Sequence, residues 1–157
     1  YFDGEIVMKA GDVMTAGAAT VRPDTSLAEA ARIMLDNRIS GLPVVDTAGR
    51  LVGIVTERDF LRSGRDGRRW IDALLSEASG QATAKQLHDC LVEDVMSRNP
   101  ISIGVEAPVS EAMELMERHN VRRIPIVAND KVAGIVSVTD LLLALMRKTY
   151  RIPDRAG

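Results

Sequence analysis

Hydrophobic residues along the chain follow two patterns, and each pattern predicts one kind of element. From Ser26 to Asn37 the apolar side chains recur every three or four positions, as on one face of a helix. Ser26 and Glu29 also have the spacing of a capping box at a helix start. Elsewhere the apolar residues form short runs between turn residues, a pattern typical of strands. The first part of the chain is therefore predicted to contain, in order, a strand at 20–21, a helix at 26–37, strands at 41–45 and 50–55 joined by a turn at 46–49, and a helix from 56 to about 61.

The same succession of elements is predicted a second time, about 82 positions later. Met14 matches Met96, and Pro43 matches Pro125, each within a run of similar residues. Several matches in the same order indicate an internal repeat, and a period this long indicates two copies of one small unit rather than a solenoid. The second copy is predicted as a strand at 101–103, a helix at 108–120, strands at 124–127 and 132–136 with a turn at 129–130, and a helix at 138–148.

The clearest repeated motif is Gly53–Asp59, which returns as Gly134–Asp140. In each copy a short apolar strand leads into a predicted helix start. A hydroxyl residue, Thr56 or Ser137, stands three positions before the aspartate. The hydroxyl can cap the helix, and a carboxylate on the first turn interacts favourably with the helix dipole. The same oriented groups can also bind a polar ligand, and the motif by itself leaves both roles open.

Composition narrows the class of protein. The chain has 157 residues, of which 46% are hydrophobic and 27% charged, so it can bury a core. Aromatic residues make up only 3%, which leaves little for stacking on single-stranded nucleic acid, and the net charge of −2 gives no general attraction to nucleic acid or membrane. No apolar run approaches the roughly 20 residues of a membrane span. One cysteine, Cys90, excludes an internal disulfide and favours a reducing, cytoplasmic compartment.

The sequence contains no recognisable set of catalytic residues. His88 and His119 lie far apart, without the spacing of metal ligands. No Ser/His/Asp arrangement and no glycine-rich phosphate loop is present. We therefore expect neither an enzyme nor a metal site, and no catalytic cofactor.

The segment between the two copies has no counterpart in the repeat. A basic run at 62–69 is expected to be a solvated linker, and two amphipathic helices are predicted at 70–75 and 83–91, with Trp70 as a packing anchor. The first residues resemble the remnant of a cleavable tag. The predicted organisation is a tag remnant and leader at 1–8, a first domain at 9–61, a helical insert at 62–92, a second domain at 93–148 and a frayed tail at 149–157.

Taken together, these motifs resemble a tandem pair of cystathionine-β-synthase (CBS) domains. The resemblance is carried by Asp12–Met14, Ser40–Val45 and Gly53–Asp59, and by their echoes between Asp94 and Asp140. It implies an α/β (α+β) fold in which two pseudo-twofold related β-α-β-β-α units pack through their sheets, with the helical insert between them. It also implies homodimers, and up to two clefts between the repeats that bind AMP, ADP, ATP or S-adenosylmethionine.

In the family pattern, each cleft combines residues from both repeats. The first cleft would contain Thr25, Ile39, Ser40, Ile135, Ser137 and Asp140, with Thr139 nearby. The second cleft would contain Ile54, Thr56, Arg58, Asp59, Val121, Arg122 and Arg123. Arg123 stands where the first repeat has Gly41, so the two clefts need not bind the same ligand.

The residue types in these implied clefts suit a nucleoside. A carboxylate such as Asp59 or Asp140 can accept hydrogen bonds from both hydroxyls of a ribose. Apolar strand residues can form the walls around an adenine. Arg58, Arg122 and Arg123 can neutralise a phosphate, so the second cleft is better suited to a phosphorylated nucleotide. The opposing interpretation makes the aspartates and hydroxyls plain caps, and Arg122 and Arg123 solvated surface residues.

The leading functional prediction is a regulatory module that senses an adenosyl ligand and signals through the geometry of a dimer or of a regulated enzyme or transporter. The alternative is a scaffold without a ligand that only holds partners together. Binding to nucleic acid through the basic run at 62–69 is a minor alternative.

Overall fold

The computed structural model describes residues 8–62, 69–78 and 90–150. The chain forms two compact units. One unit comprises the described residues from Ala19 to Pro100 and is called the α2 unit. The other comprises the described residues up to Ala18 together with those from Ile101 onward, and is called the α6 unit.

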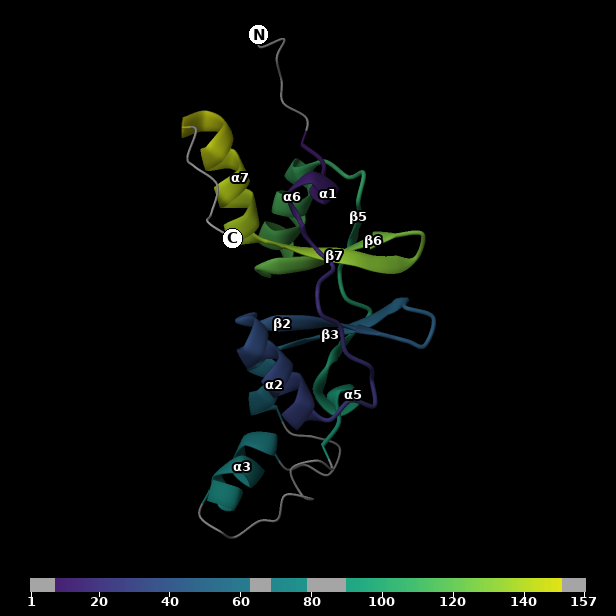
Figure 1. Ribbon diagram of the computed structural model, residues 1–157, viewed down its shortest axis with the longest axis vertical. Coiled ribbons are helices and arrows are strands. Elements are labelled where there is room, and N and C mark those ends of the chain that lie inside the picture. The colour runs from purple at the N-terminus through teal and green to yellow at the C-terminus, as the bar shows by residue number, and fades with distance from the viewer. Residues whose placement is uncertain (1–7, 63–68, 79–89, 151–157) are drawn as a thin grey trace. The chain divides into compact units, whose positions relative to one another are not determined.

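The α2 unit is a three-stranded antiparallel sheet covered by helices (Figure 1). The strand order is β2-β3-β4, and Val21 adds one isolated parallel bridge to Val44 at the edge of β2. The predicted strand at 20–21 is therefore reduced to a single bridge. The elements are α2 (Leu27–Asn37), β2 (Gly41–Val45), β3 (Leu51–Thr56), the 3-10 helix η1 (Glu57–Leu61), α3 (Trp70–Ala78), α5 (Val92–Val95) and β4 (Ser97–Arg98).

The α6 unit has the matching topology. Its strand order is β1-β7-β6-β5, with β5 parallel to β6 and the other pairs antiparallel. Ile103 pairs with Ile126 in the same way that Val21 pairs with Val44. The elements are α1 (Ala10–Val13), β1 (Thr15–Ala16), β5 (Ile103–Gly104), α6 (Val109–His119), β6 (Arg123–Ala128), β7 (Lys131–Ser137) and α7 (Val138–Tyr150).

Each unit has its own apolar core, built from equivalent positions of the repeat. Met34 and Val44 are buried in the α2 unit, and Met116 and Ile126 are buried in the α6 unit. The mixed α+β fold predicted from the sequence is confirmed.

The helix that follows each hairpin differs between the units. The predicted helix from residue 56 is only the five-residue 3-10 helix η1, whereas α7 continues to Tyr150, beyond its predicted end. Leucine and alanine follow Asp140, and both favour helix, whereas Ser63 and Gly64 stand early in the segment after Asp59 and disfavour it.

In the insert, the predicted helix at 70–75 is confirmed as α3. Trp70 is buried and packs edge-on against Phe60, with the ring centroids 5.4 Å apart. This contact attaches α3 to η1. The helix predicted at 83–91 lies outside the described residues except for Cys90 and Leu91, which are not helical.

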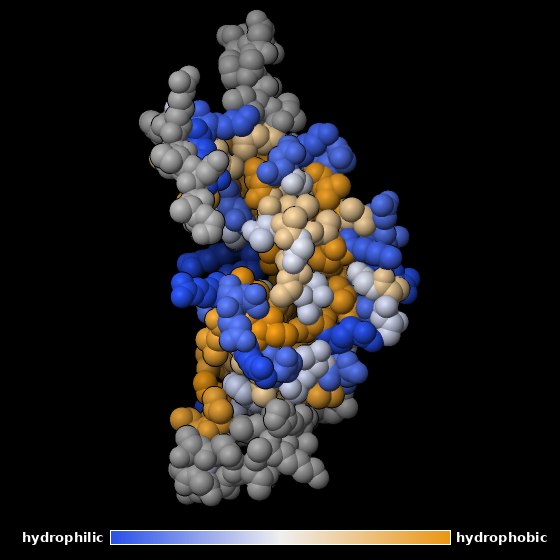
Figure 2. All heavy atoms as spheres, in the orientation of Figure 1, coloured by the Kyte–Doolittle hydropathy of each residue, from blue (hydrophilic) through white to orange (hydrophobic). Residues whose placement is uncertain are grey.

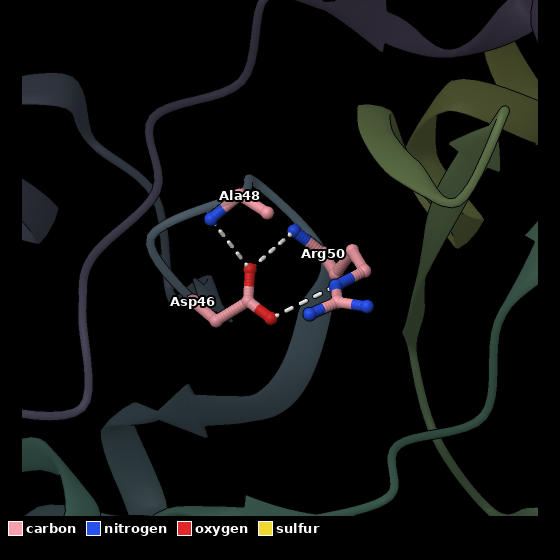
Figure 3. A network of polar contacts seen from close by, with 3 residues as sticks. All are labelled: Asp46, Ala48 and Arg50. Carbon is pink, nitrogen blue, oxygen red and sulfur yellow. Dashed lines mark hydrogen bonds and ion pairs between the residues drawn. The ribbon is translucent and has the colours of Figure 1, made fainter.

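Side chains and backbone conformation define the ends of these elements. Ser26 caps α2, since its hydroxyl accepts the Glu29 N–H at 3.1 Å. Arg38 ends α2 and Asn120 ends α6, both in the left-handed conformation, with φ of 53° and 54°. In the turn between β2 and β3, Asp46 accepts hydrogen bonds from the Ala48 and Arg50 N–H groups and pairs with the Arg50 guanidinium (Figure 3).

One edge strand of each sheet comes from the start of the other sequence repeat. β1 pairs with β7, although residues up to Ala18 precede the first repeat's hairpin, and β4 pairs with β3 in the same way. The compact units therefore divide the chain elsewhere than the predicted domains 9–61 and 93–148, because strand pairing joins each short segment to the sheet of the other repeat.

Two glycines permit this pairing. A Cβ on Gly134 would lie 2.5 Å from the Thr15 carbonyl oxygen and 2.7 Å from the Met14 sulfur. A Cβ on Gly53 would lie 2.7 Å from the Met96 sulfur. The incoming strand and its methionine thus occupy the space that a side chain would need.

We expect Gly134→Ala to destabilise the protein by about 1–3 kcal/mol, because the added methyl group overpacks the contact between β1 and β7. Gly104→Ala is the matched control, since the nearest atom to its Cβ would be 4.0 Å away. Urea unfolding followed by circular dichroism measures both variants. Equal stability of the two variants would contradict the packing of β1 on Gly134.

Candidate functional site

The two repeated corners lie where the second strand of each hairpin meets the following helix. In the α2 unit the Glu57 N–H donates to the Ser40 carbonyl at 3.0 Å, and in the α6 unit the Val138 N–H donates to the Arg122 carbonyl at 3.0 Å. These bonds tie the residue before the hairpin to the residue after it. Each corner therefore brings a hydroxyl residue, an aspartate and the start of the first hairpin strand together.

In the α6 unit, Ser137 and Asp140 form a reciprocal cap. The Ser137 N–H donates to Asp140 Oδ2 at 2.9 Å, and the Asp140 N–H donates to the Ser137 hydroxyl at 3.1 Å. Asp140 is half-buried, and within the described residues its Oδ1 accepts no hydrogen bond. The capping role is therefore present, and one carboxylate oxygen remains for another donor.

In the α2 unit, Asp59 is far more enclosed and is only 6% exposed. Its Oδ2 accepts the Thr56 N–H at 2.8 Å and the Thr56 hydroxyl at 3.4 Å. Burial raises the pKa of Asp59 above its ordinary value, although the Thr56 hydrogen bonds and the nearby Arg62 and Arg58 guanidinium groups oppose this change. Desolvation is thus the dominant influence on this carboxylate.

Arg62 lies beside the Asp59 corner, although the repeated motif did not indicate it. Its Nη1 lies 3.6 Å from Asp59 Oδ1 and donates to the Val95 carbonyl at 3.1 Å. The sequence placed Arg62 in a basic linker run. Its position three residues after Asp59 on a short helix was the available signal.

The remaining predicted site residues divide between the two units, and Thr25 lies at the start of α2, at the other end of that helix from Ile39 and Ser40. Gly41 is the register partner of Thr56, and Arg123 is the register partner of Ser137. The α2 unit contains Thr25, Ile39, Ser40, Ile54, Thr56, Arg58 and Asp59, and the α6 unit contains Val121, Arg122, Arg123, Ile135, Ser137, Thr139 and Asp140. The combination of these two sets into shared clefts stays a prediction.

Exposure divides these residues by chemical type. Arg58, Arg122 and Thr139 are exposed, so they are accessible to an anionic or polar group. The apolar residues are half-buried on their strands and at the ends of helices, namely Ile39, Ile54, Val121 and Ile135. Thr25 is already engaged, since its hydroxyl accepts the Arg22 N–H at 3.0 Å.

No group of three or more His, Cys, Asp or Glu side chains in the ranges that the structure describes is placed to hold a metal ion. None of the described helices has the length and hydrophobicity of a membrane span.

The raised pKa of Asp59 predicts a pH-dependent effect of Asp59→Asn. Because the folded-state pKa is higher than the unfolded one, the wild type loses stability as the pH rises from the ordinary value near 3.8 through the folded-state pKa. The asparagine cannot ionise. The stability of this variant relative to wild type should therefore improve as the pH rises from about 3.5 to about 7, as measured by urea unfolding.

Asp46→Asn is the control with the opposite sign. The Arg50 and Ala48 N–H groups and the Arg50 guanidinium lower the pKa of Asp46, so its ionised form stabilises the folded state above the ordinary pKa. This variant should lose stability relative to wild type over the same rise in pH. If the difference in free energy of unfolding between Asp59→Asn and wild type did not change with pH, desolvation would not be the dominant influence on the pKa of Asp59.

Comparison with known proteins places the chain among CBS-domain proteins. It is 34% identical to CBS domain-containing protein YhcV of Bacillus subtilis over 136 residues, which is 86% of this chain and 84% of that protein. It is also 34% identical to inosine-5′-monophosphate dehydrogenase of Methanocaldococcus jannaschii over 139 residues, which is 88% of this chain but only 24% of that enzyme.

Solved structures agree. The CBS domain pair of protein MJ0100, in complex with 5′-methylthioadenosine and S-adenosyl-L-methionine, matches with a TM-score of 0.69 and 26% identity, over 91% of this chain and 99% of that chain. The family model of the CBS domain matches residues 10–66 and 92–147. The repeat, the two similar units and these matches lead to one conclusion: the chain belongs to the CBS domain family and carries two copies of the domain.

Proposed function

We propose that this chain is a regulatory module that senses an adenosyl compound in clefts shared by its two CBS domains. The observation that carries the proposal is the duplicated corner, in which a hydroxyl residue and an aspartate are held together at the end of a hairpin. The 5′-methylthioadenosine and S-adenosyl-L-methionine bound by the MJ0100 domain pair support the adenosyl class.

The chemistry of the α6 corner suits a ribose. Asp140 Oδ2 is occupied by the Ser137 N–H, whereas Oδ1 is available to accept a hydroxyl hydrogen. A charge-assisted hydrogen bond of this kind contributes about 1.5–3 kcal/mol. The half-buried Ile39 and Ile135 supply apolar surface for an adenine in the first cleft.

The arginines suggest that the second cleft takes a phosphorylated ligand. Arg58 and Arg122 are exposed, and neither forms a salt bridge with a carboxylate of the described residues. Thr56 and the half-buried Ile54 and Val121 complete that proposed cleft. AMP, ADP or ATP fits this arrangement better than an uncharged nucleoside, because the guanidinium groups neutralise phosphate.

The ligand would act as a regulator by shifting the population of the protein between alternative arrangements of its two domains. A ligand that contacts both domains stabilises the arrangement in which both contacts are made, and its differential affinity sets the size of the shift. A regulated enzyme or transporter would then read the altered arrangement. The match to the dehydrogenase is consistent with this role, since it covers a quarter of that enzyme rather than the whole.

The central test is isothermal titration of the chain with AMP, ATP and S-adenosylmethionine. We expect binding of at least one of them, and we expect Asp140→Ala to weaken it by about 10- to 100-fold through the loss of a charge-assisted contact. Asp36→Ala is the matched control, because this aspartate lies on the surface of α2, with a side chain 70% exposed. Absence of binding by all three compounds at millimolar concentration would refute the proposal.

A second role, dimerisation, is favoured by an open apolar groove of about 320 Å³ on the α6 unit. It lies between α6 and α7 and is lined by Met113, Met116, Glu117, Val121, Val138, Leu141 and Leu142. Leu142 is 58% exposed. On the face drawn in Figure 2, hydrophobic residues in orange are exposed beside hydrophilic residues in blue.

We propose that a second copy of the chain covers this groove. Exposed acidic residues lie on α6, among them Glu111 and Glu117, and the exposed Lys148 lies near the end of α7. In a twofold contact, α6 of one copy can therefore face α7 of the other with complementary charge. The homodimer predicted from the sequence is part of this proposal. The cytoplasmic location stays a separate prediction.

Leu142→Lys should shift the protein from dimer toward monomer, because it places a charge in the apolar contact. Light scattering after size-exclusion chromatography measures the mass. Leu35→Lys is the comparison on the α2 unit, since Leu35 is also exposed but lies outside the groove. A wild-type protein that is monomeric at all concentrations would exclude the dimer.

A further inference from the structure

The two corners differ in the surroundings of their carboxylates. Asp59 is buried, and its Oδ1 has the Arg62 guanidinium 3.6 Å away. Asp140 is half-buried, and its Oδ1 accepts no hydrogen bond within the described residues. The same motif therefore presents one carboxylate that is already paired and one that is available.

A single position accounts for the pairing. Arg62 follows Asp59 by three residues, and Leu143 occupies the matching place after Asp140. Leucine has no polar group that can reach the carboxylate, so the α6 corner has no equivalent of the ion pair. No other cation is within salt-bridge distance of Asp59, and none is within that distance of Asp140, among the residues described.

Arg62 is held from two sides. The same Nη1 that faces Asp59 also donates to the Val95 carbonyl at the end of α5. Anchoring to a backbone carbonyl restricts the guanidinium, although the side chain is 58% exposed. The arginine thus stays beside the carboxylate even though solvent surrounds much of it.

We propose that Arg62 is a specificity-determining residue that makes the two nucleoside sites unequal. It competes with a ligand hydroxyl for Asp59 Oδ1, so the site built on Asp140 binds an adenosyl ligand without phosphate first and more tightly. The inference rests on the proposed adenosyl-binding function. It adds to that function an order of occupancy, which follows from one arginine that the other repeat lacks.

The physical basis is a difference in what each carboxylate must give up. A ribose that binds Asp59 has to share or displace a charged donor and reach a buried group, and both requirements reduce the net gain from the new hydrogen bonds. A ribose that binds Asp140 meets a carboxylate that forms no ion pair with the described residues. The expected result is two classes of site that differ in affinity by about tenfold or more, the range of one charge-assisted contact.

The test is titration of the full chain with 5′-methylthioadenosine and S-adenosylmethionine, neither of which carries a phosphate. It compares wild type with Arg62→Leu, which installs the residue of the matching position. The wild type should show one stronger and one weaker site, and Arg62→Leu should tighten the weaker site by about tenfold while the stronger site keeps its affinity. Arg98→Leu is the matched control, because Arg98 also donates to a carbonyl of α5, that of Glu93, without contacting Asp59.

The reciprocal variant, Leu143→Arg, should weaken the stronger site, and it tests the inference even if Arg62→Leu does not fold. Two equal sites in the wild type, or tightening by Arg98→Leu as large as by Arg62→Leu, would overturn the role of Arg62 and leave adenosyl binding intact. Binding by Arg62→Leu but not by wild type would support the role of Arg62. No binding by wild type or by Arg62→Leu would overturn both proposals.

Discussion

The close approach of a short strand to a glycine is the contact on which both sheets depend. Met14 and Thr15 lie against Gly134, and Met96 lies against Gly53. Because a side chain at either glycine would occupy the same space, the sheet edge can accept the incoming strand only where Cβ is absent. The paired segments β1 and β4 thereby become parts of sheets whose other strands are distant in the sequence.

Because short segments pair with the sheet of the other repeat, the sequence repeats and the compact units have different boundaries. A sequence repeat is a record of duplication, whereas a compact unit is a set of residues that bury surface together. Here the two divide the chain at different residues, since Val92 and Val95 enter the core around Leu27, and Ala10 enters the core around Ile124. Each unit therefore contains residues from both sequence repeats, and the α6 unit is built from two separate segments of the chain.

The corners show how one motif acquires two sets of properties. Asp59 accepts the Thr56 N–H and Asp140 accepts the Ser137 N–H, so each aspartate is a cap, whereas ligand binding by the motif stays a prediction. What differs is the remaining carboxylate oxygen, which depends on burial and on Arg62. The short η1 helix brings Arg62 back toward Asp59, whereas the long α7 helix places Leu143 at the matching position.

The sequence by itself determined the repeat, the α+β class, the helices at 26–37 and 108–120 to within two residues, and the hairpins that place both corners. These features depend on periodicity, capping and turn residues, which act over a few positions along the chain. Only the tertiary structure decided that β1 joins the sheet of β7 and β4 joins the sheet of β3, that Asp59 is buried while Asp140 keeps an available oxygen, and that the Val95 carbonyl holds Arg62 beside Asp59. Those properties arise from contacts between residues far apart in sequence and from the solvent that packing excludes, and no local pattern encodes either of them.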